Sequence, residues 1–170
     1  MSMSPQIISL SSSITYHLRN ITRIRRFLDF DTCNHVVRSL VLWRLDYANA
    51  LLLGANLTSI QRLQRLQNWG AKLIFRAPKS DHATKYLDKL LPVQERITYK
   101  ILMYVFKCLN GMGPEYLSCQ LAPYTNARPG LRSSIDTTLL PVPKFSHKEY
   151  QSAADKSFFS AAPKLWNALH

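Results

Sequence analysis

The feature that most constrains the fold of this sequence is the repeated spacing of apolar residues by three and four positions, interrupted by glycine and proline. Such spacing places the apolar side chains on one side of an α-helix. Four long segments show it, and the last three end near the breakers Gly54, Pro78 and Gly111. We therefore expect a mainly α-helical protein, a bundle of about four to six helices.

Capping residues set the expected helix limits. Asp31 suits the N-cap of the second helix, and Asn56 or Thr58 suits that of the third. We expect helices from about Ser13 to Leu28, from Asp31 to about Leu53, from Asn56 or Thr58 to before Pro78, and from Pro92 to Gly111. The inward side of the second helix is predicted to carry Cys33, Val36, Val37, Leu40, Tyr47, Ala48 and Leu51.

Composition divides the chain into three parts. Residues 1–12 are polar and rich in serine, so we expect a disordered N-terminal tail. Residues 13–122 carry the helical segments and are predicted to form the bundle. Residues 123–170 contain prolines and loop-like stretches. We expect a loop-rich segment there, with at most a short strand, ending in a helix that His170 truncates.

The charge balance favours a polyanionic partner. Lysine and arginine number 22 and the acids number 10, which gives a formal net charge of +12. Such a balance suits nucleic acid first and an acidic membrane surface second. No apolar run approaches the ~20 residues of a membrane span, and no secretory leader is visible. The cysteines show no paired spacing. We therefore expect an intracellular protein, nuclear or cytoplasmic, that is not secreted.

The third segment, "TSIQRLQRLQNWGAKLIFRAPK", separates apolar from basic side chains most clearly. Arginines one helical turn apart are able to neutralise successive phosphates, and an indole between them is able to stack on an unpaired base. Fainter basic stripes lie on the first segment and, through Arg96, Lys100 and Lys107, on the fourth. The candidate nucleic-acid-binding residues are Arg62, Arg65, Lys72, Arg76, Trp69, Arg19, Arg23 and Arg26.

Other interpretations of these residues stay open at the level of sequence. A charged face often only keeps a helix soluble, and Trp69 also suits packing against a neighbouring helix. Phe75 belongs to neither the apolar nor the basic side of its segment. Arg25 falls near an apolar stripe, where it needs an acid or a position at the border.

The residue types needed for catalysis are present but scattered. No two acids are adjacent; Asp29 and Asp31 fit a turn and a cap, and Asp46, beside Arg44, fits an ion pair. The histidines and cysteines lack ligand spacing, and no glycine-rich phosphate loop occurs. We predict no catalytic residue, no metal site and no cofactor.

Several stretches resemble the C-terminal part of reverse transcriptases from non-LTR retrotransposons, of the LINE or jockey-like type. The motifs "RLDY", "LQRLQN", "KCLNG" and "AAPKLWN" occur in this order, and the similarity runs from about Ile14 to His170. The resemblance implies a helical thumb and the segment beyond it. It also implies a role in holding the RNA template and the growing DNA strand beside the active site.

The sequence also departs from that family. The "Ala-Asp-Asp" metal-binding motif is missing, the segment between His82 and Pro92 is shorter than usual, and Trp69 stands where small residues are typical. These departures indicate a catalytically inactive fragment. Its basic helix sides predict residual, non-specific RNA or DNA binding. The alternative is a non-enzymatic module for protein interaction or assembly, with self-association through surface that loss of the palm exposes.

Overall fold

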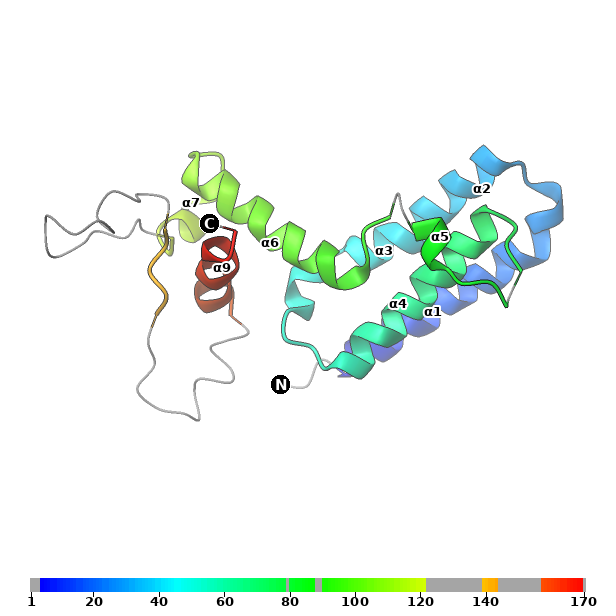
Figure 1. Cartoon of the computed structure of the whole chain (residues 1–170), viewed down its shortest axis with the longest axis horizontal. Helices are drawn as coiled ribbons and strands as arrows, with labels where there is room; N and C mark the ends of the chain where they lie inside the picture. The colour runs from blue at the N-terminus through cyan, green and yellow to red at the C-terminus, as the bar shows by residue number, and fades with distance from the viewer. Residues whose placement is uncertain (1–3, 79, 88–89, 122–138, 144–156, 170) are drawn as a thin grey trace, which may run out of the picture. The chain divides into compact units, whose positions relative to one another are not determined.

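The protein is mainly α-helical, as the sequence predicts. The computed structural model describes residues 4–78, 80–87, 90–121, 139–143 and 157–169, and none of these lies in a β-strand. The helices of this part of the chain are α1 (Ser4–Ile24), η1 (Arg25–Phe27), α2 (Phe30–Val37), η2 (Arg38–Leu42), α3 (Trp43–Asp46), η3 (Asn49–Leu52), α4 (Leu57–Ile74), α5 (Thr84–Leu87), α6 (Val93–Leu109), α7 (Glu115–Ser118) and α9 (Phe158–Asn167) (Figure 1).

The chain divides into two compact units at a point inside α6. The first unit comprises Met1–Ile97 and the second comprises Thr98–His170. The expected bundle of residues 13–122 is thus distributed over both units. The candidate nucleic-acid-binding residues all belong to the first unit.

The first helix, α1, begins at Ser4, so the expected disordered tail is wrong for residues 4–12. The physical reason is that the buried side of this helix continues upstream of Ile14, through a buried serine as well as an isoleucine. Ile7 is 3% exposed and Ser11 is 2% exposed. Together with Ile14 and Leu18 they keep the three-and-four spacing of a buried helix side. The serine-rich composition concealed this continuity.

The expected second helix is interrupted. A π-helix, η2, follows α2, and its wider turn rotates the side chains that follow it relative to an ideal α-helix. Val41 and Leu45 are buried as a result, whereas Leu40 lies on the outside. The helix then ends at Asp46, because Tyr47 is extended and Ala48 is left-handed, with φ 53°. Tyr47, Ala48 and Leu51 are therefore exposed, and their predicted inward positions were wrong.

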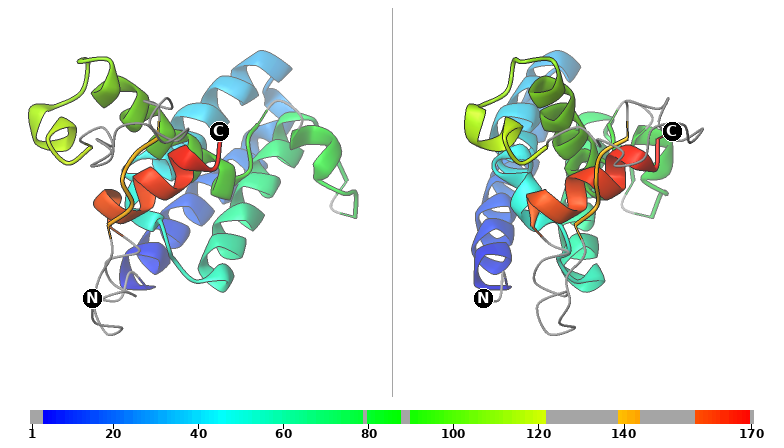
Figure 2. Two further views of the ribbon diagram at one scale, coloured as in Figure 1. Left: turned by 60° about the vertical axis from the view of Figure 1, so that its left-hand side comes forward. Right: turned by 90° about the vertical axis from the view of Figure 1, so that its left-hand side faces the viewer.

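The core of the first unit lies where α1 and α2 pack against α4. Figures 1 and 2 show α1 and α4 side by side and running in the same direction. Gly70 permits the close approach: a Cβ built there lies 3.1 Å from Cγ1 of Val37 and 3.7 Å from Cδ2 of Leu18. The buried side of α4 therefore packs against α1 and α2, and the polar side of α4 faces away from both helices.

Polar side chains of α4 also hold the start of α6. The Val93 N–H, one of the groups that a helix N-terminus leaves unpaired, donates to Oε1 of Gln64 at 2.8 Å. Gln67 is fully buried and donates to the carbonyl of Leu91 at 2.8 Å. These bonds position the short connection after α5 against α4.

The second unit contains most of α6 together with α7 and α9. Ile101, Val105 and Cys108 form the buried side of α6 in this unit, at the three-and-four spacing of an inward helix side. The described residues 139–143 form neither helix nor strand. Their backbone is held at Leu140, whose N–H and carbonyl pair with the side-chain amide of Asn167 at 2.9 and 2.8 Å. The remaining predictions for 123–138 and 144–156 lie outside the described residues.

Candidate nucleic-acid interface

The basic side of α4 is presented by a well-defined helix. Asn56 caps its N-terminus, as one of the two predicted caps, because its Oδ1 accepts from the Ser59 N–H at 3.0 Å. With the apolar side held against α1 and α2, Arg62 and Arg65 point outward and are exposed. These two guanidinium groups lie about one turn apart, at the spacing that suits successive phosphates.

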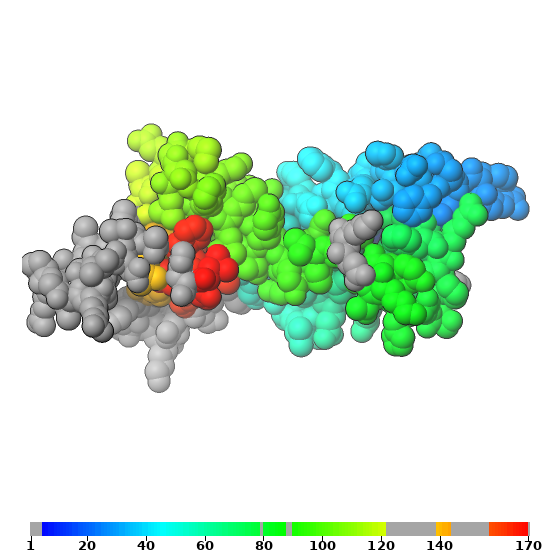
Figure 3. All heavy atoms as spheres, turned by 45° about the horizontal axis from the view of Figure 1, so that its top comes forward, coloured from blue at the N-terminus to red at the C-terminus, as the bar shows by residue number. Residues whose placement is uncertain are grey.

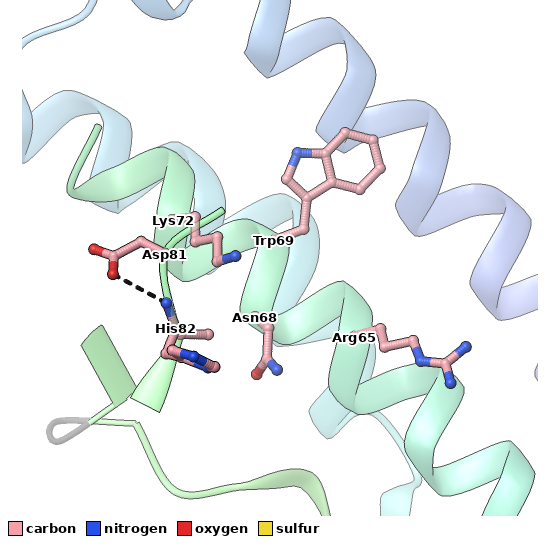
Figure 4. A pocket seen from close by; sticks show the side chains of 7 residues that line it. Arg65, Asn68, Trp69, Lys72, Asp81 and His82 are labelled. Atoms are coloured by element: carbon pink, nitrogen blue, oxygen red, sulfur yellow. Dashed lines mark hydrogen bonds between the residues drawn. The ribbon is translucent and has the colours of Figure 1, made fainter. Parts of the chain in front are cut away.

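An open hollow of about 430 Å³ lies beside this basic side. Arg65, Asn68, Trp69 and Lys72 line it from α4, and the turn from Asp81 to Ala83 closes the opposite side (Figure 4). Figure 4 shows the Arg65 guanidinium extending away from Asp81, and the Trp69 indole extending in a different direction from both. The hollow is therefore edged by a cation, an amide and an indole that do not converge on one point.

Lys72 differs from Arg62 and Arg65 in its surroundings. Its side chain is half-buried, and its charge contributes to lowering the pKa of Asp81. The largest cause of that lowered pKa is the hydrogen bond from the Tyr86 hydroxyl, at 2.6 Å; Lys85, 3.9 Å away, contributes less. Lys72 and Asp81 line the same hollow, and Lys72 is the smallest of the causes that shift the pKa of Asp81.

Arg76 lies beyond the end of α4, in the left-handed region with φ 53°. Its guanidinium is exposed and donates to the carbonyl of Leu28 at 3.0 Å. The turn of the backbone takes this residue out of the regular helical stripe that the sequence predicts. Arg76 therefore connects the end of α4 to the segment after η1.

Among the described residues Arg25 pairs with no acid, although an acidic partner is one of the two environments that the sequence predicts for it. It is 9% exposed, and its guanidinium donates to the carbonyls of Leu73, Leu28 and Ile74. Leu73 and Ile74 are the last residues of α4, where carbonyls lack partners within the helix. Arg25 thus caps α4 from another helix, and its place near an apolar stripe was the available signal.

The other predicted residues divide by exposure. Arg19, Arg23 and Arg26 are all exposed on α1 and η1, and the Arg26 guanidinium lies 4.5 Å from the centre of the Phe27 ring. Trp69 is half-buried. Arg96, on the fainter stripe of the fourth segment, is bound to Asp46 by two contacts of 2.9 Å. The expected partner of Asp46 was Arg44.

Sequence reasoning missed an aromatic cluster at the end of α4. Phe75 contacts Phe30 with ring centres 5.5 Å apart, and contacts Tyr86 with ring centres 5.2 Å apart. The one available signal was that Phe75 fits neither the apolar nor the basic side of its segment. Partners from α2 and α5 cannot be inferred from a helical projection of α4 alone.

The described residues contain no cluster of three or more histidine, cysteine or acidic side chains that could hold a metal ion. In the same part of the chain, no helix has both the length and the apolar character to cross a membrane. Burial raises the pKa of the Cys33 thiol, which disfavours its reactive thiolate form.

Comparison of the chain with protein-family models, with curated proteins and with solved structures found no match.

Proposed function

We propose that this protein is a non-catalytic derivative of the thumb region of a non-LTR retrotransposon reverse transcriptase, and that it binds RNA or DNA without sequence specificity. The binding surface is the outward side of α4 at Arg62 and Arg65, widened by Arg19, Arg23 and Arg26. No cofactor is required for this activity, because the binding energy comes from phosphate neutralisation and counterion release.

The observation that carries the proposal is the exposure of Arg62 and Arg65 on a helix whose opposite side is packed. A packed helix fixes the backbone separation of the two residues, so only their side chains and not the helix need to be ordered when phosphates bind. The net charge of +12 favours association with any polyanion. The motifs from "RLDY" to "AAPKLWN", and the helical fold that they imply, support the origin.

The test is the affinity of the double variant Arg62→Gln/Arg65→Gln for an RNA–DNA duplex at 50 mM NaCl, measured by fluorescence anisotropy. Loss of two phosphate contacts is expected to weaken binding by about tenfold. Both side chains are exposed, so the variant is expected to keep the circular dichroism spectrum of the wild type.

A matched control carries the same change of charge elsewhere. Arg44 and Lys107 are exposed on α3 and α6, and neither belongs to the proposed surface. Arg44→Gln/Lys107→Gln is expected to change the affinity less than threefold. Equal losses in the two double variants would show that only total charge matters and would refute an interface on α4.

A second candidate function, protein interaction or self-association, is favoured by large apolar side chains that face solvent. Trp43, Tyr47 and Leu51 are 71%, 77% and 67% exposed within a short stretch of the first unit. Exposed apolar side chains gathered in this way often mark an interface. Association that persists at 1 M NaCl and is lost in Trp43→Ser, followed by sedimentation velocity, would support this function over nucleic-acid binding.

A further inference from the structure

A small cleft at the end of α4 combines aromatic rings with positive charge. It has a volume of about 280 Å³ and lies within the first unit, between α2, the end of α4 and α5. In Figure 3 the green atoms of the segment after α4 lie against the blue atoms of α2. The residues that matter here are Phe30, Asn34, Arg38, Phe75, Lys85 and Tyr86.

The aromatic side chains of this cleft are only partly used in packing. Phe30 is 48% exposed and Phe75 is 43% exposed, although both rings contact a neighbouring ring. Tyr86 is held in place because its hydroxyl donates to Asp81 at 2.6 Å. The cluster is thus supported on one side and leaves ring surface open to a planar ligand.

Among the described residues that line the cleft, the charged side chains are those of Arg38 and Lys85, and both are positive. Nε of Arg38 donates to Oδ1 of Asn34 at 3.0 Å, which orients the guanidinium and leaves its terminal nitrogens available to a ligand. The Lys85 side chain is 74% exposed, and its 3.9 Å ion pair with Asp81 is one that solvent screens. Both cations are therefore able to meet an anion at the rim.

We propose that this cleft binds one unpaired nucleotide of a single-stranded nucleic acid. The base stacks on the Phe75 ring and meets the inclined Phe30 ring at its edge, because the two ring planes lie 60° apart, and the adjoining phosphate lies between Arg38 and Lys85. Proteins that bind single-stranded nucleic acid without sequence specificity use aromatic rings that stack on bases, beside cations that contact the phosphates. The volume is near the lower limit of ligand pockets, about 300 Å³, which suits one nucleotide. The inference rests on the proposed nucleic-acid binding and adds a preference for unpaired bases.

The first experiment changes the ligand and leaves the protein intact. Anisotropy compares a labelled strand of about 20 thymidines with a fully abasic strand of equal length, so that the phosphates stay the same and no base is left to stack. The wild type is expected to bind the thymidine strand at least about fivefold more tightly, as one stacked base provides. Equal affinities would overturn the proposal.

The second experiment changes the ring. Phe75→Leu keeps an apolar side chain in the cleft but removes the aromatic surface. It is expected to lose the preference for thymidine over abasic strands while keeping its affinity for duplex within about twofold. A cooperative thermal melt confirms folding.

Lys85→Gln, which leaves the rings unchanged, is expected to reduce the magnitude of the salt slope for single-strand binding by about 0.7. Retention of the full thymidine preference by a folded Phe75→Leu would contradict the inference.

The outcomes separate this inference from the proposed function. If Arg62→Gln/Arg65→Gln weakens duplex binding but no base-dependent binding is found, the cleft proposal fails and the proposed function survives. If the wild type binds neither duplex nor single strand, both fail. A labelled acidic peptide that contains phenylalanine tests another ligand. If this peptide binds the wild type but not Phe75→Leu, and no base-dependent strand binding is found, then the cleft binds a peptide and the proposal is overturned.

Discussion

The arginines at the end of α4 and those nearer its start have different roles, although all of them contribute to the same basic composition. Arg25 and Arg76 donate to backbone carbonyls, whereas Arg62 and Arg65 extend into solvent. For Arg25 the difference follows from helix geometry, because the last turn of α4 leaves carbonyls that the helix itself does not pair. Arg25 is therefore part of the fold, whereas Arg62 and Arg65 keep their charges for a partner.

The largest effect that would test this contrast is expected at Arg25. Arg25→Met keeps much of the side-chain volume but removes the guanidinium donors to the carbonyls of Leu73, Ile74 and Leu28, so we expect a loss of about 3 kcal/mol in the free energy of unfolding. Urea denaturation followed by circular dichroism measures it. Arg23→Met, exposed on the neighbouring helix, should change stability by less than about 0.5 kcal/mol. Similar midpoints for the two variants would contradict a structural role for Arg25.

A smaller effect is expected at Arg76. Arg76→Gln loses one exposed hydrogen bond to Leu28 and should cost about 0.5–1 kcal/mol. Arg76→Gly loses the same bond but relieves the positive φ of 53°, so we expect it to be more stable than Arg76→Gln. The same urea experiment serves both variants. If Arg76→Gly were the less stable of the two, the side-chain bond would matter more than the backbone conformation.

Much of the fold follows from local sequence because the signals are local. The apolar spacing and Asn56 locate α4, and the isoleucines of α6 mark its buried side. The π-helix η2 was missed because its residues have ordinary helix-forming character; its position depends on packing against α1 and α4. The start of α1 was missed because Ser11 is buried, and a serine does not register in an apolar pattern.

Within the candidate interface, only the outward positions of Arg62 and Arg65 could be predicted from the sequence. A helical projection places Arg62 and Arg65 outward because the opposite side of α4 is continuous and apolar. It cannot show that Asp81 and Lys72 line the same hollow, since the two lie on different elements. It also cannot show that Phe30 from α2 and Tyr86 from α5 meet Phe75. Contacts of this kind depend on tertiary arrangement, which one helix does not encode.

The most direct test of the contrast between the two groups of arginines is the salt dependence of duplex binding. The slope of log affinity against log salt should decrease in magnitude by about 1.8 in Arg62→Gln/Arg65→Gln, because each lost phosphate contact contributes about 0.9. In Arg76→Gln it should match the wild type. An unchanged slope in the double variant, or an equal decrease in Arg76→Gln, would contradict the account.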